Sequence, residues 1–194
     1  MIQAMPDLST ASDADLARQV AAGDRDAAAV LVARHERVVR SFLRRVCFDG
    51  SLVDDLAQET FMRLLRYAGH YDPAYPMRTW LLTIARRLSI TQGQKKLRLS
   101  DPDTLADFAQ APEAEQPLDR QDRINHRDRH LNRALRQLSE PQRVAITLFY
   151  QQNMAVEEMA KVMEMPAGTV KSHLHRARAA LEESLSPHAQ EFMP

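Results

Sequence analysis

Acidic and amide side chains gather over one short stretch of the chain, Asp54-Asp55-Leu56-Ala57-Gln58-Glu59-Thr60-Phe61. In a helix, residues three and four apart lie on the same face, so Asp55, Gln58 and Glu59 would form one polar patch. Paired carboxylates can serve acid–base catalysis or bind a divalent cation. However, no histidine or further acid follows at ligand spacing, and no glycine-rich phosphate loop is present. Two interpretations stay open: a solvated helix face, and a surface that docks basic residues of a partner protein.

A second stretch, beginning at Ala167, combines small, polar and basic residues. In a helix that starts there, Val170, Leu174, Ala177 and Leu181 share one apolar face. The opposite face is short, polar and basic, which suits a helix that enters the major groove of DNA with its N-terminus first. Backbone N–H groups at the helix start would suit a phosphate. The residues expected on or beside this face are Gly168, Thr169, Lys171, Ser172, His175, Arg176, Arg178 and Ala179.

The preceding helix, expected over 155–164, is joined to this one by the short turn Glu164-Met165-Pro166. It contains Ala160, which is small enough for two helices to cross closely. An ordinary amphipathic hairpin with a solvated basic face is the alternative. The short turn, the small crossing residue and the basic first turns occur together, and together they favour a DNA-binding helix-turn-helix.

The formal net charge is zero, which by itself argues against a nucleic-acid-binding protein. The distribution reverses that impression. Residues 34–98 hold thirteen Lys and Arg against six Asp and Glu, and residues 124–181 hold nine against five. Between them, residues 101–122 hold one Arg against seven acids. Two basic blocks therefore flank an acidic segment.

The first block is predicted to form four helices. They are expected over 13–22, from Asp24 to about Phe48, from Ser51 to near Gly69, and from about Met77 onward. Ser12 with Asp15, and Ser51 with Asp54, resemble capping boxes at two of the helix starts. The segment 70–76, with prolines at 73 and 76, is expected to be a loop. The fourth helix places Trp80 on its apolar face, where a core position is favoured.

The remainder of the chain divides into a linker and a second helical block. Residues 99–122 contain three prolines and many acids, a composition that cannot bury a core, so they are expected to be mostly extended. A short helix over 104–109 would be marginal. The second block, 123–185, shows helical periodicity throughout, and Ser139-Glu140-Pro141-Gln142 is a helix-start signature. No strand pattern occurs. The sequence predicts an all-α protein of two small helical domains, 13–98 and 123–185, with a disordered N-terminus (1–12) and a C-terminal tail (186–194).

Several classes of protein are disfavoured. The single cysteine, Cys47, excludes an internal disulfide and a cysteine-rich zinc site, and its apolar helical setting favours a buried, unreactive thiol. His126 and His130 are four residues apart but lack further ligands at suitable spacing. We expect no metal site, no cofactor and no enzymatic activity. No apolar run is long enough to cross a membrane and no secretion signal is present, so a cytoplasmic location without membrane insertion is expected.

The order of these motifs resembles the extracytoplasmic-function (ECF) group of bacterial RNA polymerase sigma factors, over roughly residues 13–185. Residues 54–61 match the family's Asp-x-x-Gln-Glu-x-Phe segment, and Arg78-Thr79-Trp80-Leu81-Leu82-Thr83-Ile84-Ala85-Arg86-Arg87 match its promoter-melting helix. Leu138-Ser139-Glu140-Pro141-Gln142-Arg143 and residues 168–178 match the two ends of its second domain. These two domains are called sigma-2 and sigma-4, and they are joined by a linker.

The resemblance implies a role for each surface. Core RNA polymerase would bind through its β′ clamp helices to Asp54, Asp55, Gln58, Glu59 and Phe61, and through its β flap. The −10 promoter element would be melted and bound by Tyr71, Tyr75, Arg78, Trp80, Arg86 and Arg87, with the tyrosines offering rings to a flipped base. The −35 element would be bound by Thr169, Lys171, Ser172, His175, Arg176 and Arg178. An anti-sigma factor is a further expected partner, and the acidic linker would thread through polymerase channels.

Three positions depart from the family pattern. Arg87 stands where the family often has Asn, Glu164 occupies the usual Gly of the helix-turn-helix turn, and Ala155 replaces the usual Ser or Thr cap. Two other functions remain as alternatives. One is a stand-alone helix-turn-helix regulator of the LuxR type, which would not need residues 54–61 or the basic Trp80 helix. The other is a sigma-like competitor that acts only through protein contacts.

Overall fold

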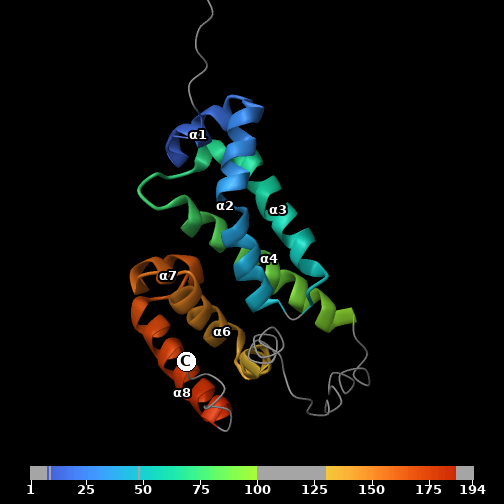
Figure 1. The fold of residues 1–194 in the computed structure, drawn as a ribbon, viewed down its shortest axis with the longest axis vertical. Helices are drawn as coiled ribbons and strands as arrows, with labels where there is room; N and C mark the ends of the chain where they lie inside the picture. The colour runs from blue at the N-terminus through green and yellow to red at the C-terminus, as the bar shows by residue number, and fades with distance from the viewer. Residues whose placement is uncertain (1–7, 9, 48, 100–129, 187–194) are drawn as a thin grey trace, which may run out of the picture.

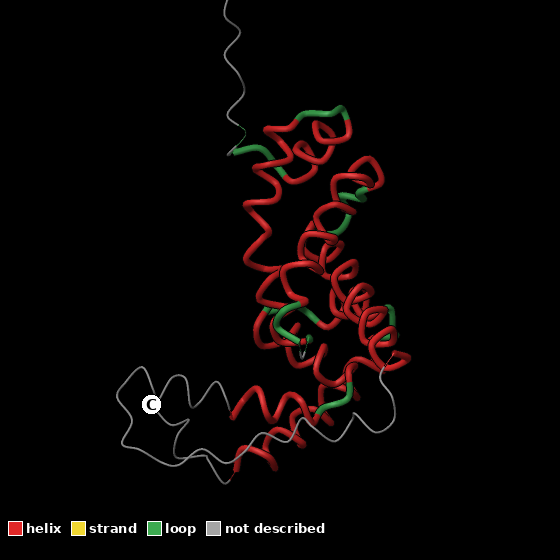
Figure 2. Tube along the Cα trace, turned by 90° about the vertical axis from the view of Figure 1, so that its right-hand side faces the viewer, coloured by secondary structure: helices red, strands yellow, loops and turns green. Residues whose placement is uncertain are grey.

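The computed structural model describes residues 8, 10–47, 49–99 and 130–186 of the chain. Over these residues the regular structure is entirely helical, as the tube in Figure 2 shows, and no strand is formed. The expectation of an all-α fold is confirmed. The predicted linker (99–122) and its marginal helix at 104–109 lie outside the described residues, apart from residue 99 at the end of a helix.

The first half of the chain forms four helices: α1 (Asp13–Ala21), α2 (Arg25–Val46), α3 (Leu52–Tyr67) and α4 (Met77–Leu99), with a short 3₁₀ turn, η1 (Ala68–His70), after α3. Polar caps start the first two. Ser12 Oγ accepts the Asp15 N–H at 3.1 Å, and one carboxylate oxygen of Asp24 accepts the N–H groups of Asp26 and Ala27. These side chains satisfy backbone donors that have no partner within the helix.

The predicted capping box at Ser51 and Asp54 is wrong. Ser51 has helical backbone angles and makes no side-chain cap. Instead the Asp49 carboxylate accepts the Ser51 N–H at 3.1 Å, and Asp54 is paired with Arg40 of α2. The turn before α3 is therefore held by the acid two residues earlier, which leaves Asp54 on the helix surface.

Helix α2 runs through the middle of the first half and packs against α1, α3 and α4 (Figure 1). Its side chains Phe42 and Leu43 are completely buried, as are Leu64 of α3 and Leu81 and Leu82 of α4. Burial of each such side chain contributes about 1.5–3 kcal/mol. This core fixes which faces of α3 and α4 point outward.

The second half begins with a helical segment over 130–137. It continues with α6 (Glu140–Ile146), a π-helical turn η3 (Thr147–Gln151), α7 (Val156–Met163) and α8 (Ala167–Leu185). The predicted start of α6 is confirmed, since Gln142 Oε1 accepts the Ser139 N–H at 3.0 Å. Ala155 makes no side-chain cap at the start of α7, as its type implies.

The two halves pack directly on each other, which the sequence did not predict. Helix α4 lies along α7, and the C-terminal end of α2 contacts α6 and η3 (Figure 1). Arg143 of α6 is almost fully buried at this junction, where its guanidinium donates to the backbone oxygens of Val46 (3.3 Å) and Leu138 (2.9 Å). Burial lowers the pKa of Arg143, and the carbonyl partners compensate part of the cost of desolvating it. Buried apolar side chains of both halves form one continuous cluster.

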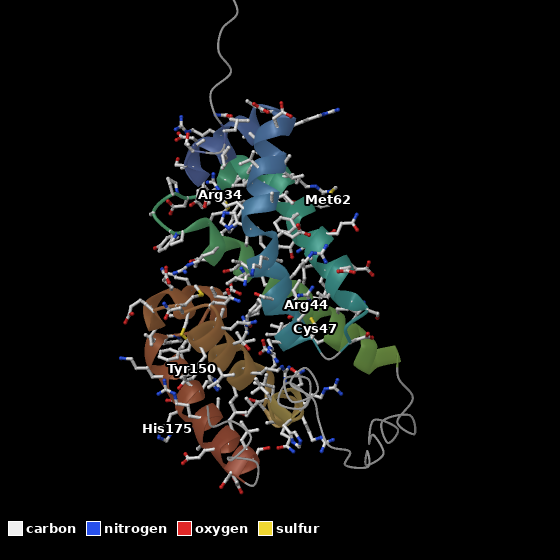
Figure 3. The ribbon with its side chains drawn as sticks, viewed as in Figure 1. Arg34, Arg44, Cys47, Met62, Tyr150 and His175 are labelled. Atoms are coloured by element: carbon white, nitrogen blue, oxygen red, sulfur yellow. The ribbon has the colours of Figure 1, made fainter. Side chains whose placement is uncertain are left out.

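Cys47, labelled in Figure 3, lies half-buried at the end of α2, and burial raises the pKa of its thiol to about 11. Only the thiolate is nucleophilic. An unperturbed thiol is roughly one quarter ionised at pH 8, against roughly 0.1% for a pKa of 11. We expect iodoacetamide to alkylate the folded protein at pH 8 at least about a hundredfold more slowly than the same protein in denaturant. Equal rates, followed by mass spectrometry, would contradict this placement.

Candidate functional site

The acidic patch lies on the outer face of α3. Val53, Leu56, Ala57, Thr60 and Leu64 point into the core. The pattern of buried positions leaves four of the predicted binding residues exposed: Asp54, Asp55, Gln58 and Glu59. The structure therefore brings these four side chains together on one helix face, as their spacing predicts.

Neighbouring arginine side chains neutralise part of this negative charge. Arg40 of α2 bridges Asp54 and Glu36, and Arg63 donates to Glu59 at 2.8 Å one turn further along α3. The side chains of Asp55 and Gln58 make no hydrogen bond or ion pair with the residues that the structure describes. The most available carboxylate of the patch is thus Asp55, which suits a basic partner side chain rather than a metal ion.

The prediction that Phe61 contacts a partner protein directly needs correction. Its side chain is only 8% exposed and belongs to the core, so it positions α3 rather than offering a surface. The neighbouring Met62, labelled in Figure 3, is 50% exposed and lies one turn from Gln58 and Glu59 on the helix surface. Sequence reasoning missed Met62, although a large apolar side chain at an outward position between polar residues was a readable signal.

The loop before α4 is held by its own contacts. The Asp72 carboxylate accepts the Ala74 N–H at 2.9 Å, and the Tyr71 hydroxyl donates to the Tyr75 carbonyl oxygen at 2.7 Å. The Tyr71 ring lies against Trp80, with centroids 5.7 Å apart. Of the two tyrosines expected to meet a base, Tyr75 is the more accessible at 41% exposure.

The basic residues of α4 meet the second half of the chain. Arg78 donates to Glu158 of α7 at 2.8 Å. Arg86 is 7% exposed and donates to Glu140 of α6 at 3.1 Å and to the Met163 carbonyl oxygen at 3.0 Å. In this arrangement Arg86 is not the free DNA-facing cation that the sequence led us to expect, because the packing of α4 on α6 and α7 buries it.

Arg87 is exposed but paired. It donates to both carboxylate oxygens of Glu164, one of them at 3.0 Å, and these hydrogen bonds lower the pKa of Glu164 and raise that of Arg87. The ammonium of Lys161 in α7 also lies 4.9 Å from the centre of the Tyr75 ring. All five of these contacts join the loop before α4 or α4 itself to the second half of the chain, and so link residues far apart in the sequence.

Helix α8 displays the predicted basic face. Val170, Leu174 and Ala177 are buried against the rest of the second half. The six side chains expected to contact DNA are all exposed: Thr169, Lys171, Ser172, His175, Arg176 and Arg178. One detail is corrected: the Thr169 N–H is not free for a phosphate, because it donates to the Pro166 carbonyl oxygen at 2.9 Å.

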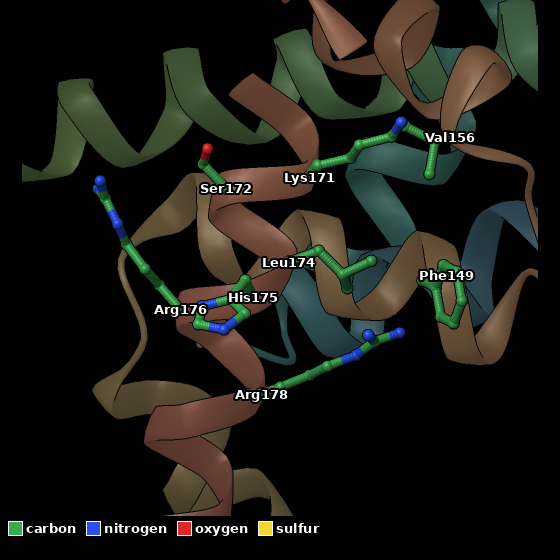
Figure 4. A pocket seen from close by; sticks show the side chains of 8 residues that line it. All are labelled: Phe149, Val156, Lys171, Ser172, Leu174, His175, Arg176 and Arg178. Carbon is green, nitrogen blue, oxygen red and sulfur yellow. The ribbon is translucent and has the colours of Figure 1, made fainter. Parts of the chain in front are cut away.

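A shallow groove of about 640 Å³ runs beside this face, with Phe149 and Val156 on its far wall (Figure 4). Arg176 and Arg178 extend to opposite sides of α8 in this view. The Arg178 guanidinium lies 4.8 Å from the centre of the Phe149 ring, and this stacking holds it at the edge of the face. Arg178 is therefore less free than Lys171, His175 and Arg176.

The turn between α7 and α8 passes through Glu164 in the left-handed conformation, at φ 55° and ψ 42°. This position favours glycine, since a side chain there meets the backbone. The N–H groups of Glu164 and Met165 nonetheless close the end of α7 onto the carbonyls of Lys161 and Ala160. The turn has the expected geometry, built with an unfavourable residue.

The described residues offer no group of His, Cys, Asp and Glu side chains that could hold a metal ion. Among these same residues, no helix is both long and apolar enough to cross a membrane. The exposed charged groups described above are acids on α3 and cations on α8, together with the paired Arg87 on α4.

Two family models match the two halves of the chain. Residues 31–98 match the model of sigma-70 region 2, and residues 129–181 match that of sigma-70 region 4. The first match contains the acidic patch and Arg78, Arg86 and Arg87 of α4, and the second contains α7 and most of α8. The two helical halves thus correspond to the two sigma-70 regions.

Similar curated proteins cover nearly the whole chain. CarQ of Myxococcus xanthus is 32% identical over 167 residues, which are 84% of this chain and 91% of that protein. Sigma-E of Escherichia coli K12 is 30% identical over 188 residues, which are 91% and 95% of the two chains. Sigma-H of Pseudomonas aeruginosa is 29% identical over 190 residues, 93% and 97% of the two.

Two solved structures have a fold similar to that of this chain. The sigma factor RpoE of Bartonella quintana, solved in complex with the anti-sigma factor NepR, is 28% identical with a TM-score of 0.64, covering 80% of this chain and 94% of that one. CnrH, solved with the cytosolic domain of CnrY, shares the fold at 24% identity and a TM-score of 0.66, covering 90% and 97%. The chain belongs to the ECF group of bacterial RNA polymerase sigma factors, which direct promoter-specific transcription initiation.

Sequence reasoning missed the glutamates that meet α4, namely Glu140, Glu158 and Glu164. A partial signal existed. Arg87 and Glu164 are both departures from the family pattern, and they carry opposite charges. Two unusual residues of opposite charge in different domains are compatible with a direct contact, which the structure shows.

The left-handed turn gives a stability prediction. In an Arg87→Gln background, which removes the ion pair, Glu164→Gly should raise the free energy of unfolding by about 1 kcal/mol, because glycine adopts this conformation without steric cost. Ala179→Gly, at an exposed position inside α8, should lower it by about 1 kcal/mol. Urea denaturation measures both. If Glu164→Gly destabilises as much as Ala179→Gly, the left-handed turn is not populated in solution.

Proposed function

We propose that this sigma factor uses three separate surfaces: α3 for core polymerase, α4 with the loop before it for the −10 element, and α8 for the −35 element. The observation that supports this proposal is that an exposed acidic patch and two basic helical faces lie on different elements of one chain. A stand-alone regulator would need only the basic face of α8. The acidic patch and the arginine-bearing α4 therefore favour the sigma role over that alternative.

On α3, Asp54, Asp55, Gln58 and Glu59 would meet basic side chains of the β′ clamp helices. Met62 would add an apolar contact at the C-terminal edge of the same patch, one turn beyond Gln58 and Glu59, because its side chain is exposed there. Phe61 would act indirectly, by holding α3 in place from the core. The β flap would meet the second domain.

On the promoter, Arg78, Arg86 and Arg87 would neutralise backbone phosphates beside the melted −10 element, with Tyr75 and Tyr71 stacking on unpaired bases. Lys171, Ser172, His175 and Arg176 would enter the major groove at −35, with Thr169 and Arg178 at the edges. The acidic linker would follow polymerase channels that normally hold nucleic acid. Polymerase itself would perform the chemistry, so the chain would act without catalysis, in the cytoplasm where promoter DNA lies.

We also propose an anti-sigma partner, as in the solved complex of RpoE with NepR. Direct ion pairs and a continuous apolar cluster already fill the junction between the two domains. A partner that binds this arrangement would wrap around the outside rather than insert between α4 and α7.

Run-off transcription tests the proposal as a whole. Core polymerase with the purified, partner-free chain should give discrete transcripts from a promoter library, and core polymerase alone should not. A sigma-like competitor would give no new transcripts. Failure of the folded, partner-free chain to produce any promoter-specific transcript would contradict the proposed function.

The α3 surface has its own test. The double variant Asp55→Lys/Glu59→Lys should lower affinity for core polymerase at least about a hundredfold, because like charges would then face each other across the interface. The matched control, Glu182→Lys/Glu183→Lys, makes the same change in net charge at exposed positions near the end of α8 and should bind normally. Fluorescence anisotropy measures both. Equal binding by the two variants would show that α3 is not the docking surface.

A further inference from the structure

The −10 surface is already occupied within the chain itself. Arg78, Arg86 and Arg87 each donate to a glutamate of the second domain, and Tyr75 lies beneath Lys161. The other two candidate residues, Tyr71 and Trp80, stack on one another. Each of the six side chains proposed for the −10 element therefore has a partner in this arrangement.

The glutamates occupy the places that phosphates would need. An arginine fork binds a carboxylate or a phosphate through the same N–H groups, so the two anions exclude each other. Glu164 takes two N–H groups of Arg87, and Glu140 takes one of the almost fully buried Arg86. A DNA backbone could reach these guanidinium groups only after α6 and α7 had moved away from α4.

The geometry of Glu164 supports this reading. Glycine would satisfy the left-handed turn without strain but could not pair with Arg87. The glutamate adopts the unfavourable backbone angles and places its carboxylate on an arginine of the other domain. The side chain thus contributes at the domain junction rather than to the turn in which it lies.

The two outer ion pairs, Arg78–Glu158 and Arg87–Glu164, are weak enough to be reversible. The side chains of Arg78 and Arg87 are 37% and 60% exposed, and ion pairs at such positions each change an equilibrium by only a few-fold. Salt screens exposed pairs of this kind. The buried contacts of Arg86 and the apolar packing also hold the closed arrangement, so it opens only when a stronger anion or a large protein surface competes for the same groups.

We propose that this chain has a closed, self-masked state in which Glu140, Glu158 and Glu164 of the second domain hold the arginines of α4 and exclude DNA. The inference rests on the proposed −10 role of those arginines. In the closed state the second domain acts as an internal competitor of single-stranded DNA, and docking on polymerase separates the two domains and frees α4.

The test uses the full chain with Glu158→Gln/Glu164→Gln, which keeps side-chain shape but removes two of the three carboxylates. Its control is Glu36→Gln/Glu183→Gln, which makes the same change in net charge at exposed positions away from the junction. Fluorescent labels on Cys residues introduced at Met62 and Ala179, in a Cys47→Ser background, report the distance between α3 and α8. The probe for binding is an end-labelled, random-sequence single-stranded 20-mer DNA.

Energy transfer between the labels should fall in Glu158→Gln/Glu164→Gln and stay at the wild-type value in the control. The 20-mer should bind the opened variant about tenfold more tightly than either, since two exposed ion pairs no longer compete. Binding is compared in a Lys171→Ala/Arg176→Ala background, so that α8 does not contribute. Unchanged energy transfer, or opening with no gain in DNA affinity, would overturn the proposal.

A charge exchange separates opening from misfolding. Arg87→Glu and Glu164→Arg should each lower energy transfer when made alone, and the double variant should restore it, because the pair is rebuilt in reverse. No recovery in the double variant would contradict the direct contact. Run-off transcription by the wild-type chain decides the sigma role independently, so loss of one conclusion does not carry the other with it.

Discussion

The guanidinium groups of α4 require an anionic partner. The arrangement of the two domains depends on whether that partner is a carboxylate of the chain or a phosphate of DNA. Arg86 is the clearest case, because at 7% exposure it is too far from water to remain unpaired at low cost. In the free chain it donates to one glutamate, Glu140, and to the Met163 carbonyl oxygen at the end of α7. On a promoter, phosphates would take their place. The arrangement of the two domains and the availability of the −10 surface are therefore aspects of one equilibrium.

The core makes this exchange possible without unfolding. Fully buried side chains such as Leu81 and Leu82 hold α4 against α2 from one side, so its polar flank can change partners while the helix stays in place. The second domain keeps its own anchors, Val170 and Leu174, beneath α8. The basic face of α8 is exposed in this arrangement, so the proposed −35 surface stays open while the proposed −10 surface is covered.

Local patterns predicted much of this. Apolar periodicity located the helices, and the exposed faces of α3 and α8 follow from which of their residues had to be buried. Phe61 was misjudged because a motif match does not tell whether a side chain faces the partner or the core. The Ser51 cap failed because Asp49 satisfies the same turn. Glu140 and Glu158 looked like ordinary helix-start acids, and their pairing with α4 depends on domain packing that sequence periodicity does not encode. The predicted linker stays untested.

The central claim is that one set of arginines alternates between intramolecular carboxylates and promoter DNA. The most direct measurement is the distance between labels on α3 and α8 of the wild-type chain, taken by double electron–electron resonance first free and then on core polymerase with promoter DNA. The account predicts one short distance in the free chain and a clearly longer one in the complex. The same distance in both states would contradict it.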